Sequence, residues 1–495
     1  MAQNNHQPWS PWHGAPVEKG RRHGQAGTMM RGSPIAAQPE ATLQDDAEAL
    51  APSESSVSTG RSWVRPVAFA ILSVSLALLG AVLFAYLRDH RSLEVAPGSP
   101  QVGLGLLAGT LALMALAVVV RRVDGTVRSL IWTSVSWSLA LLLGLILAWA
   151  AIPTFERQDA WHGTPVQNAA DLDAYLARHV AEGNDPILIP TGILVQSLEF
   201  LNGDNIQVTG YVWQRLGPNL PDDLVPGVVL PEGTKDSYKQ SEAYRYDENG
   251  VETIGWYFET ILREPFEYAE YPFDEQDLWL RLWARDFTQN TVLVPDFASY
   301  TSLDPKALPG LEKDFVYSGW TPIYAGFSLA NQPYSTSFGI RTANQSAGRP
   351  EMYFNLILDR NFAGPFFEHM VFAIAVMILL FGLLVLTTDD PDLKARFQLS
   401  TAGVLGSASG LLFAVILKHN QLRSVVASPG VSYIEVIPIL LYGVIVVVVL
   451  NAILLASPYK VKIVHHRSNL VPVLAYWPVV LGLLFGVTLV VFFRA

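Results

Sequence analysis

Long uninterrupted runs of hydrophobic residues dominate the pattern along the chain. An α-helix rises about 1.5 Å per residue, so about 20 apolar residues cross the roughly 30 Å hydrocarbon core of a membrane. Runs of this length cover residues 66–87, 101–120, 129–152, 366–387, 397–417, 432–456 and 472–493. The first run begins too far along the chain, and is too long, for a secretory signal. The pattern therefore predicts seven transmembrane helices.

Between the third and the fourth run the pattern changes to that of an extramembrane domain. Apolar residues recur at helical spacing over 168–182, where Asn168 is a candidate cap. Alternating apolar positions then flank an Asn202-Gly203-Asp204-Asn205 turn, which is typical of a β-hairpin. Further candidate strands cover 253–262, 276–284, 290–295, 315–328 and 351–360. These elements predict an antiparallel β-sandwich.

Basic residues beside the hydrophobic runs set the orientation, because cytoplasmic loops retain Lys and Arg. They flank the first run and lie in the loops after the second and the sixth: Arg61, Arg65, Arg121, Arg122, Arg128, Lys460, Lys462 and Arg467. We therefore expect a cytoplasmic N-terminus, with residues 153–365 and the C-terminus outside the cytoplasm. The chain has no cysteine, and an exported domain without disulfides favours a bacterial inner membrane.

These patterns predict a membrane α + β fold in five parts. Residues 1–62 are rich in Gly, Pro, Ser, Gln and His and poor in aliphatic residues, so we expect a disordered cytoplasmic tail. The other parts are a three-helix transmembrane module at 63–152, a helical linker at 153–189, an extracytoplasmic antiparallel β-sandwich at 190–362 and a four-helix transmembrane bundle at 363–495.

Composition and charge exclude several classes of function. Of the 495 residues, 50% are hydrophobic and 16% are charged, and the net charge of -11 argues against a nucleic-acid partner. No phosphate-binding loop, HExxH or GxSxG motif occurs in the sequence. His465 and His466 are adjacent, so they point in different directions and do not form a metal site by themselves. We expect no enzymatic activity, no metal and no cofactor.

One loop carries a resemblance to a known family. The segment 268–280 contains Tyr271-Pro272-Phe273-Asp274 and resembles the loop between the sixth and seventh strands of pentameric ligand-gated ion channels. The order of the surrounding elements is similar to that family too: a hairpin at 193–213, a strand through Trp320, a last strand at 351–362 and then four helices. The resemblance covers about 190–495. It implies a homopentamer with a channel domain formed by the last four helices.

The chain also departs from the family pattern. Three transmembrane helices precede the domain, and the cysteines that flank the loop are absent, as in bacterial members of the family. The proline usual in the middle of the first channel helix is missing from 366–387, and the Trp-x-Pro segment of the agonist site has no clear counterpart. The chain is therefore a divergent relative at most, and gating by the usual route is in question.

The resemblance implies that the helix at 397–417 lines a five-fold pore. One face of it would present Gln398, Thr401, Ala402, Leu405, Ser409, Leu412 and Ile416. Polar groups on this face would hydrate ions, and the leucines and the isoleucine would form hydrophobic constrictions. The alternative is that Gly403, Gly406 and Gly410 serve only close helix packing. Both interpretations stay open on the sequence.

Three carboxylates, Asp389, Asp390 and Asp392, precede this helix at its cytoplasmic mouth. A ring of carboxylates there would concentrate cations. A carboxylate beside a helix N-terminus is also stabilising without ion traffic, and Lys394 and Arg396 oppose the field. Cation preference is therefore only slightly favoured.

The resemblance also implies a coupling site where the domain meets the membrane. Asp274 and Arg360 correspond to positions that interact in the family, and Arg423 and Glu435 lie near the loop that would receive them. The tip of the loop adds Tyr271, Pro272 and Phe273. The alternative is a static, partly solvated salt bridge, worth about 0–1 kcal/mol.

A ligand would bind between subunits under the loop at roughly 325–350. Four aromatic residues there are candidates for a cage around a cation: Tyr324, Phe327, Tyr334 and Phe338. Acidic residues also crowd around the loop with Pro272: Glu264, Glu267, Glu270, Glu275 and Asp277. Neighbouring carboxylates raise one another's pKa, so a response to protons or calcium is an equal alternative.

Two functions of different class follow from these observations. The first is a bacterial inner-membrane ion channel, a homopentamer in membrane lipid, gated by a small-molecule ligand or by protons at the extracytoplasmic domain. The second is a non-conducting membrane sensor or scaffold whose β domain binds a periplasmic partner. The missing helix proline and the glycine-rich helix at 397–417 favour the second.

Overall fold

The computed structural model describes residues 64–89, 100–120, 126–154, 161–180, 185–234, 237–313, 319–336, 338–339, 349–397, 400–426 and 430–493. The tail predicted at 1–62 and the predicted pore residue Gln398 lie outside these ranges.

Three helices open the described chain: α1 (Val64–Asp89), α2 (Pro100–Val120) and α3 (Val127–Ala151), which continues into the short 3-10 helix η1 (Ile152–Thr154). The start of α3 is capped by Thr126, whose side chain accepts a hydrogen bond from the Ser129 amide. Such a cap satisfies one of the amides that lack an acceptor within the helix. In the chain these helices pack in sequence order, α1 on α2 and α2 on α3.

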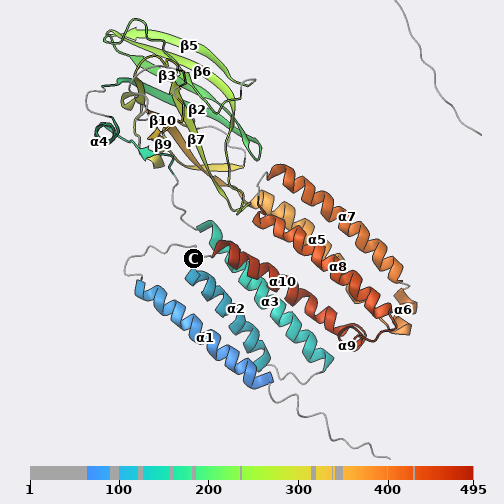
Figure 1. The fold of residues 1–495 in the computed structure, drawn as a ribbon. Coiled ribbons are helices and arrows are strands. Elements are labelled where there is room, and N and C mark those ends of the chain that lie inside the picture. The colour runs from blue at the N-terminus through green and yellow to red at the C-terminus, as the bar shows by residue number, and fades with distance from the viewer. Residues whose placement is uncertain are drawn as a thin grey trace, which may run out of the picture. The chain divides into compact units, whose positions relative to one another are not determined.

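Four further long helices follow the strands: α5 (Ala363–Leu386), α7 (Thr401–Val425), α8 (Val436–Ala456) and α10 (Leu470–Phe492). Two short helices, α6 (Pro391–Phe397) and α9 (Lys462–His465), lie in the connections between them. Figure 1 shows α10 between α8 and α3, so the C-terminal helices continue directly into the N-terminal ones.

Six helices are long and apolar enough to cross a membrane among the residues that the structure describes: α2, α3, α5, α7, α8 with the turn before it, and α10. The protein is therefore of the multi-pass membrane type. The helix α1 contributes a shorter apolar stretch, Pro66–Ala81, so the seventh span stays a prediction.

Two five-stranded sheets lie between the two groups of helices in the sequence. The first has the order β1-β9-β10-β7-β4: β1 (Thr164–Pro165), β9 (Trp320–Gln332), β10 (Arg349–Arg360), β7 (Glu275–Ala284) and β4 (Val228–Val229). The second has the order β5-β6-β3-β2-β8: β5 (Lys239–Glu248), β6 (Val251–Arg263), β3 (Asn205–Leu216), β2 (Ile187–Asn202) and β8 (Thr291–Pro295). We call residues 187–360 the two-sheet domain.

The pairing is antiparallel except between β2 and β8, which run parallel, so the second sheet is mixed rather than purely antiparallel as predicted. The apolar faces of both sheets belong to one core. Alternation builds that core: Leu278, Leu280 and Leu282 on β7 are all about 1% exposed, whereas the residues between them are not buried.

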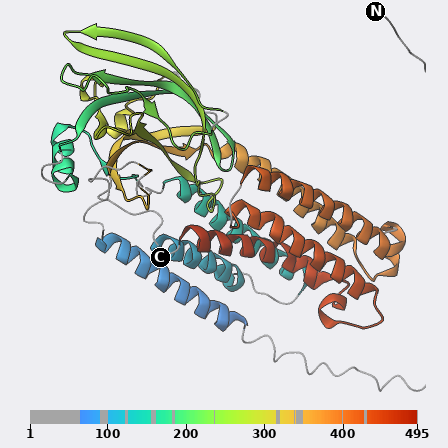
Figure 2. The same cartoon turned by 45° about the horizontal axis from the view of Figure 1, so that its top comes forward.

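Several elements differ from the predicted boundaries. The helix predicted at 168–182 is α4 (Ala169–His179), and Asn168 caps it as expected. The first hairpin strand begins at Ile187 rather than at 193, and the turn at 202–205 is where it was predicted. The strand β5 was not predicted, because it is exposed along almost its whole length and has no apolar face to reveal it. Figure 2 shows the β5–β6 hairpin at the edge of its sheet.

Candidate functional site

The loop between β6 and β7 forms the end of the two-sheet domain that meets the helices. Its backbone turns twice, with the Tyr271 amide bonded to the Tyr268 carbonyl at 3.2 Å and the Phe273 amide to the Glu270 carbonyl at 2.9 Å. We call residues 268–274 the docking loop. Its tip is buried: Tyr271, Phe273 and Asp274 are each exposed by 5% or less.

Asp274 and Arg360 form a buried, two-point ion pair at the base of the docking loop. Arg360 Nε lies 2.7 Å from Asp274 Oδ1, and Arg360 Nη2 lies 2.9 Å from Asp274 Oδ2. Gln276 Nε2 also donates to Asp274 Oδ2, at 2.6 Å. The side chain of Arg360 is 12% exposed and that of Asp274 is 2% exposed. The ion pair is therefore buried rather than partly solvated. Removing either residue would leave the other as a buried charge without a counter-charge, which destabilises the fold.

Aromatic rings surround the Arg360 guanidinium. Its carbon atom lies 4.0 Å from the ring centre of Trp320 and 4.7 Å from that of Tyr271. Cations over aromatic faces are stabilised by the ring quadrupole, and more so away from water. Burial raises the pKa of Tyr271 to about 12, so its phenol stays neutral. The ion pair and the rings together hold the last residue of β10 against the docking loop.

The docking loop binds the start of α8 through backbone hydrogen bonds. The Tyr433 amide donates to the Ala269 carbonyl at 2.8 Å, and the Ile434 amide donates to the Tyr271 carbonyl at 3.2 Å. Both amides belong to the turn η5 (Tyr433–Glu435) that opens α8. The first amides of a helix have no acceptor within it, so the helix offers donors that the loop carbonyls satisfy.

Glu435 ties the same turn to the end of α7. It is 1% exposed and accepts hydrogen bonds from the Ser432 amide at 2.7 Å and from Ser432 Oγ at 3.0 Å. Arg423 Nε, in the last turn of α7, lies 2.8 Å from Glu435 Oε1, and His419 Nε2 lies 3.4 Å from the same oxygen. The contacts thus run from the strands through the docking loop and η5 to α7.

Phe273 inserts its ring among the ends of three helices. Ring centres of Phe366 on α5 and of Phe492 on α10 each lie 5.6 Å from it, and that of Tyr433 lies 6.2 Å away. Phe362, just before α5, is closer at 5.0 Å. The residues predicted at the coupling site therefore lie together: Tyr271, Pro272, Phe273 and Asp274 in the docking loop, Arg360 beside it, and Arg423 and Glu435 below. The sequence did not point to Ala269 or Tyr433.

The predicted pore face of α7 is largely uncovered by the residues that the structure describes. Thr401, Ala402, Leu405, Ser409 and Ile416 are exposed, Leu412 is half-buried, and the opposite face carries the buried residues Val404, Ala408, Val415 and Leu422. A Cβ added at Gly406 or Gly410 would meet nothing within 4 Å. These two glycines therefore do not serve close packing within one chain.

The four aromatic residues of the predicted ligand cage do not lie together. Tyr334 and Phe338 are 5.2 Å apart between ring centres. Phe327 instead belongs to the hydrophobic core with Ala325 and Leu329, in a part of β9 where 325–329 are all buried. The Tyr324 ring lies 5.8 Å from Lys306 Nζ. The sequence grouped the four residues by their aromatic type and not by their position in the strand, and a ligand site between subunits stays a prediction.

Two other aromatic residues complete the group around Tyr334 and Phe338. The Trp283 ring centre lies 6.0 Å from each of them, and Phe287 lies 5.6 Å from Trp283. Together with Arg349, they line a cavity of about 100 Å³ beside the strand ends of β7 and β10. Aromatic walls with a few charged groups are typical of small-molecule sites, but this cavity is smaller than the roughly 300–1,000 Å³ of most such sites.

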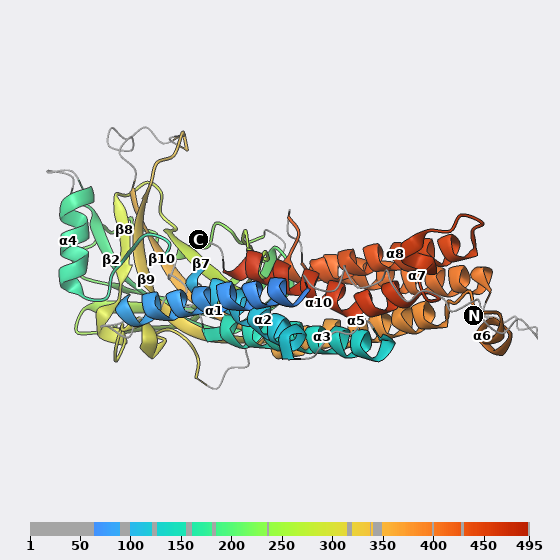
Figure 3. The ribbon, with the colours of Figure 1, turned by 90° about the horizontal axis from the view of Figure 1, so that it is seen from below.

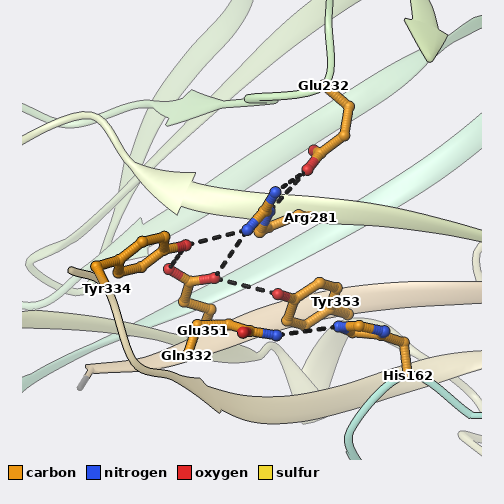
Figure 4. Close-up of polar contacts among 7 residues, drawn as sticks. All are labelled: His162, Glu232, Arg281, Gln332, Tyr334, Glu351 and Tyr353. Atoms are coloured by element: carbon orange, nitrogen blue, oxygen red, sulfur yellow. Dashed lines mark hydrogen bonds and ion pairs between the residues drawn. The ribbon is translucent and has the colours of Figure 1, made fainter. Parts of the chain in front are cut away.

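Two residues that line this cavity, Tyr334 and Glu351, belong to a polar network (Figure 4). Arg281 Nε donates to Glu232 Oε1 at 2.7 Å, and Arg281 Nη1 donates to Tyr334 Oη at 3.0 Å. Glu351 accepts from Tyr334 Oη at 2.7 Å and from Tyr353 Oη at 3.1 Å. Burial and the bond to Glu351 raise the pKa of Tyr334. The network keeps the Tyr334 ring in place.

Glu264, one of the acidic residues near the docking loop, has a buried carboxyl group. It is 4% exposed, and neither carboxyl oxygen has a hydrogen-bond partner among the described residues. Burial, with a smaller contribution from the charge of Glu232, raises its pKa to about 9. The nearby backbone of Trp279 and the charge of Arg281 oppose the rise. Glu264 is therefore protonated near neutral pH.

Comparison with known proteins adds no family to these observations. No family model matches the chain, and no curated protein matches it.

Proposed function

We propose that the chain is one subunit of a pentameric ion channel of a bacterial inner membrane, in which the two-sheet domain controls opening through the docking loop. The observation that carries the proposal is the pair of backbone hydrogen bonds from Tyr433 and Ile434 to that loop. They join the domain to the connection directly after the proposed pore helix α7. A displacement of the loop would therefore pull on the end of that helix.

The uncovered face of α7 supports a pore rather than a role in packing. Within one chain α7 is held on one side only, and the other side carries hydroxyl groups at Thr401 and Ser409. In a five-fold assembly such a face would surround a water-filled axis, with Leu405 and Ile416 as its apolar constrictions. The input would be a small molecule in the cavity beside Tyr334 and Phe338, or protons.

Single introduced thiols test the pore, because the chain has no cysteine of its own. Leu405→Cys and Ser409→Cys would be modified by a charged, membrane-impermeant reagent in liposomes. Ala408→Cys is the matched control, since Ala408 is 1% exposed on the opposite face of α7. Modification of 405 and 409 but not of 408, with five subunits in the particle and ion flux on a change of pH or ligand, is the expected result.

A non-conducting sensor is the second candidate function. Large apolar side chains also lie on the open side of α7, among them Phe413 at 63% and Leu417 at 48% exposure. Such side chains fit lipid as well as a pore. Protection of 405 and 409 from the charged reagent, in a particle without conductance, would reject the channel and favour the sensor.

A further inference from the structure

The last turn of α3 is hydrogen-bonded to the coupling site. Trp149 Nε1 lies 2.6 Å from Tyr433 Oη, and Tyr433 Oη lies 2.8 Å from Thr488 Oγ1 on α10. Thr488 Oγ1 in turn donates to the Leu484 carbonyl at 2.8 Å. An indole nitrogen only donates, so the bonds share one direction: Trp149 to Tyr433, Tyr433 to Thr488, and Thr488 to the backbone of α10.

Tyr433 is also the residue that holds the docking loop. Its amide donates to the Ala269 carbonyl, while its side chain, 1% exposed, is fixed by Trp149 and Thr488. The Trp149 ring packs edge-on against Phe366 with 4.8 Å between ring centres. One residue therefore joins the N-terminal helices, through its side chain, to the docking loop, through its backbone.

A second hydrogen bond joins α3 to α10, in the N-terminal half of α3. Ser134 Oγ donates to the Leu474 carbonyl at 2.5 Å. Between the two attachments the helices are closely packed: a Cβ at Gly144 would lie 3.3 Å from the Phe485 ring and 2.3 Å from Thr110 Oγ1. Figure 3 shows α3 beside α10. Because the packing is close, we expect a movement of α3 to displace Trp149 rather than to be absorbed along the helix.

We propose that Trp149 is a positioning residue through which the three N-terminal helices regulate the attachment of the docking loop to α8. The helices α1 to α3 then form a regulatory module, and a signal that shifts the end of α3 changes how firmly Tyr433 holds Ala269. The consequence for ion flow rests on the proposed channel function. The effect on the attachment of the docking loop does not rest on the channel function, and it can be measured without ion flow.

Hydrogen–deuterium exchange of the full-length protein in nanodiscs measures the attachment directly. The Tyr433 and Ile434 amides are the donors to the docking loop, so their exchange reports its release. Trp149→Phe keeps a ring but removes the N–H donor. We expect exchange in peptides that contain these amides to become about 5-fold to 10-fold faster, the effect of one lost hydrogen bond. Trp137→Phe is the control, because its N–H donates at 3.1 Å to Met114, inside the N-terminal module.

Tyr433→Phe removes the acceptor of the Trp149 hydrogen bond. This second variant keeps the proposal testable if Trp149→Phe does not fold. It removes the bond to Thr488 as well, so it should speed exchange at Ile434 at least as much. Adding Trp149→Phe should bring no further increase, because the bond between the two residues is already absent. Unchanged exchange in Trp149→Phe, or an equal increase in Trp137→Phe, would overturn the proposal. A particle that exchanges as expected but carries no ions would reject the channel and leave the regulatory module standing.

Discussion

A buried carboxylate lies on each side of the junction between the two-sheet domain and the helices. Asp274 is 2% exposed, Glu435 is 1% exposed, and each accepts hydrogen bonds from more than one group. A buried charge is tolerable only when it is paired and hydrogen-bonded. These contacts therefore have few intermediate arrangements, which is what a switch between two states requires.

Replacing Asp274 by Asn tests the buried ion pair. The change keeps the size of the side chain and removes its charge, which leaves Arg360 buried without a counter-charge. We expect the free energy of unfolding to fall by about 3–5 kcal/mol, measured by denaturant unfolding in detergent. Glu199→Gln removes an exposed carboxylate on β2 and should change stability by less than about 0.5 kcal/mol. Equal effects of the two changes would contradict a structural role for the pair.

Glu264→Gln is expected to change how stability depends on pH. The pKa of Glu264 is raised to about 9 in the fold by burial, and its ordinary value is about 4.3. Between these values the folded state binds more protons than the unfolded state, so rising pH removes stability from the wild type. The loss is up to about 1.4 kcal/mol for each pH unit. Gln cannot ionise and avoids it.

Thermal unfolding of both proteins between pH 6 and pH 9 checks this prediction. The stability of Glu264→Gln relative to the wild type should rise steadily across that range. Glu259→Gln on β6, the strand that ends just before Glu264, is the control, since Glu259 is less buried and is paired with Lys239 at 3.2 Å. A constant difference between Glu264→Gln and the wild type would mean that Glu264 is already ionised in the fold.

Sequence patterns reached some of these residues and not others. The contact between Asp274 and Arg360 was predicted from a resemblance to channel subunits. That resemblance could be read from the sequence because it lies in the order of segments along the chain. The bond between Trp149 and Tyr433 joins positions 284 residues apart and leaves no periodicity in either segment. The burial of Glu264 was equally hidden, because it depends on what covers the end of β6 and not on the residues beside it.

Whole elements follow the hydrophobic pattern where they have one buried face. The long helices and the strands with alternating apolar residues were predicted, since burial imposes a period of 3.6 or 2. The strand β5 lacks such a face, and the parallel contact of β2 with β8 joins segments that no hairpin connects. Pairing between distant strands is a property of the assembled sheet, so it was not readable from either strand alone.

Two glycines in membrane helices are expected to respond differently to alanine. Gly144→Ala on α3 would bring a Cβ to 2.3 Å from Thr110 Oγ1 and 3.3 Å from the Phe485 ring, whereas Gly410→Ala on α7 meets nothing within 4 Å. We expect the first to lower the melting temperature of the detergent-solubilised protein. The second should leave it unchanged or raise it, because alanine favours helices by up to about 1 kcal/mol.

The melting temperatures of the two variants, each compared with that of the wild type, test this prediction. If Gly410→Ala were as destabilising as Gly144→Ala, another surface would have to cover α7 in the solubilised particle. The size of that particle would then identify a second copy of the chain as the cover. Loss in Gly144→Ala alone supports the close packing of α3 against α2 and α10.

For the whole molecule, the first and last parts of the chain form one helical assembly. The helix α3 (Val127–Ala151) packs along α10 (Leu470–Phe492), although the whole two-sheet domain and three long helices lie between them in the sequence. The two-sheet domain meets the C-terminal helices around Phe273, Phe366 and Tyr433. Trp149 of α3 contacts Phe366 and Tyr433 at the same place. This arrangement gives the N-terminal helices direct access to the coupling site.

The orientation of the whole chain in its membrane is open to a direct test. Positive charges near Lys460 and Lys462 predict a cytoplasmic loop between α8 and α10, and the two-sheet domain is then on the other side. Single cysteines are placed at Glu248 in the β5–β6 hairpin and at Lys460, both of which are exposed. A membrane-impermeant thiol reagent applied to intact spheroplasts should label 248 and not 460, and permeabilised cells should show both. Labelling of 460 alone would reverse the orientation and place the cavity beside Tyr334 in the cytoplasm, where its ligand would have to be an intracellular molecule.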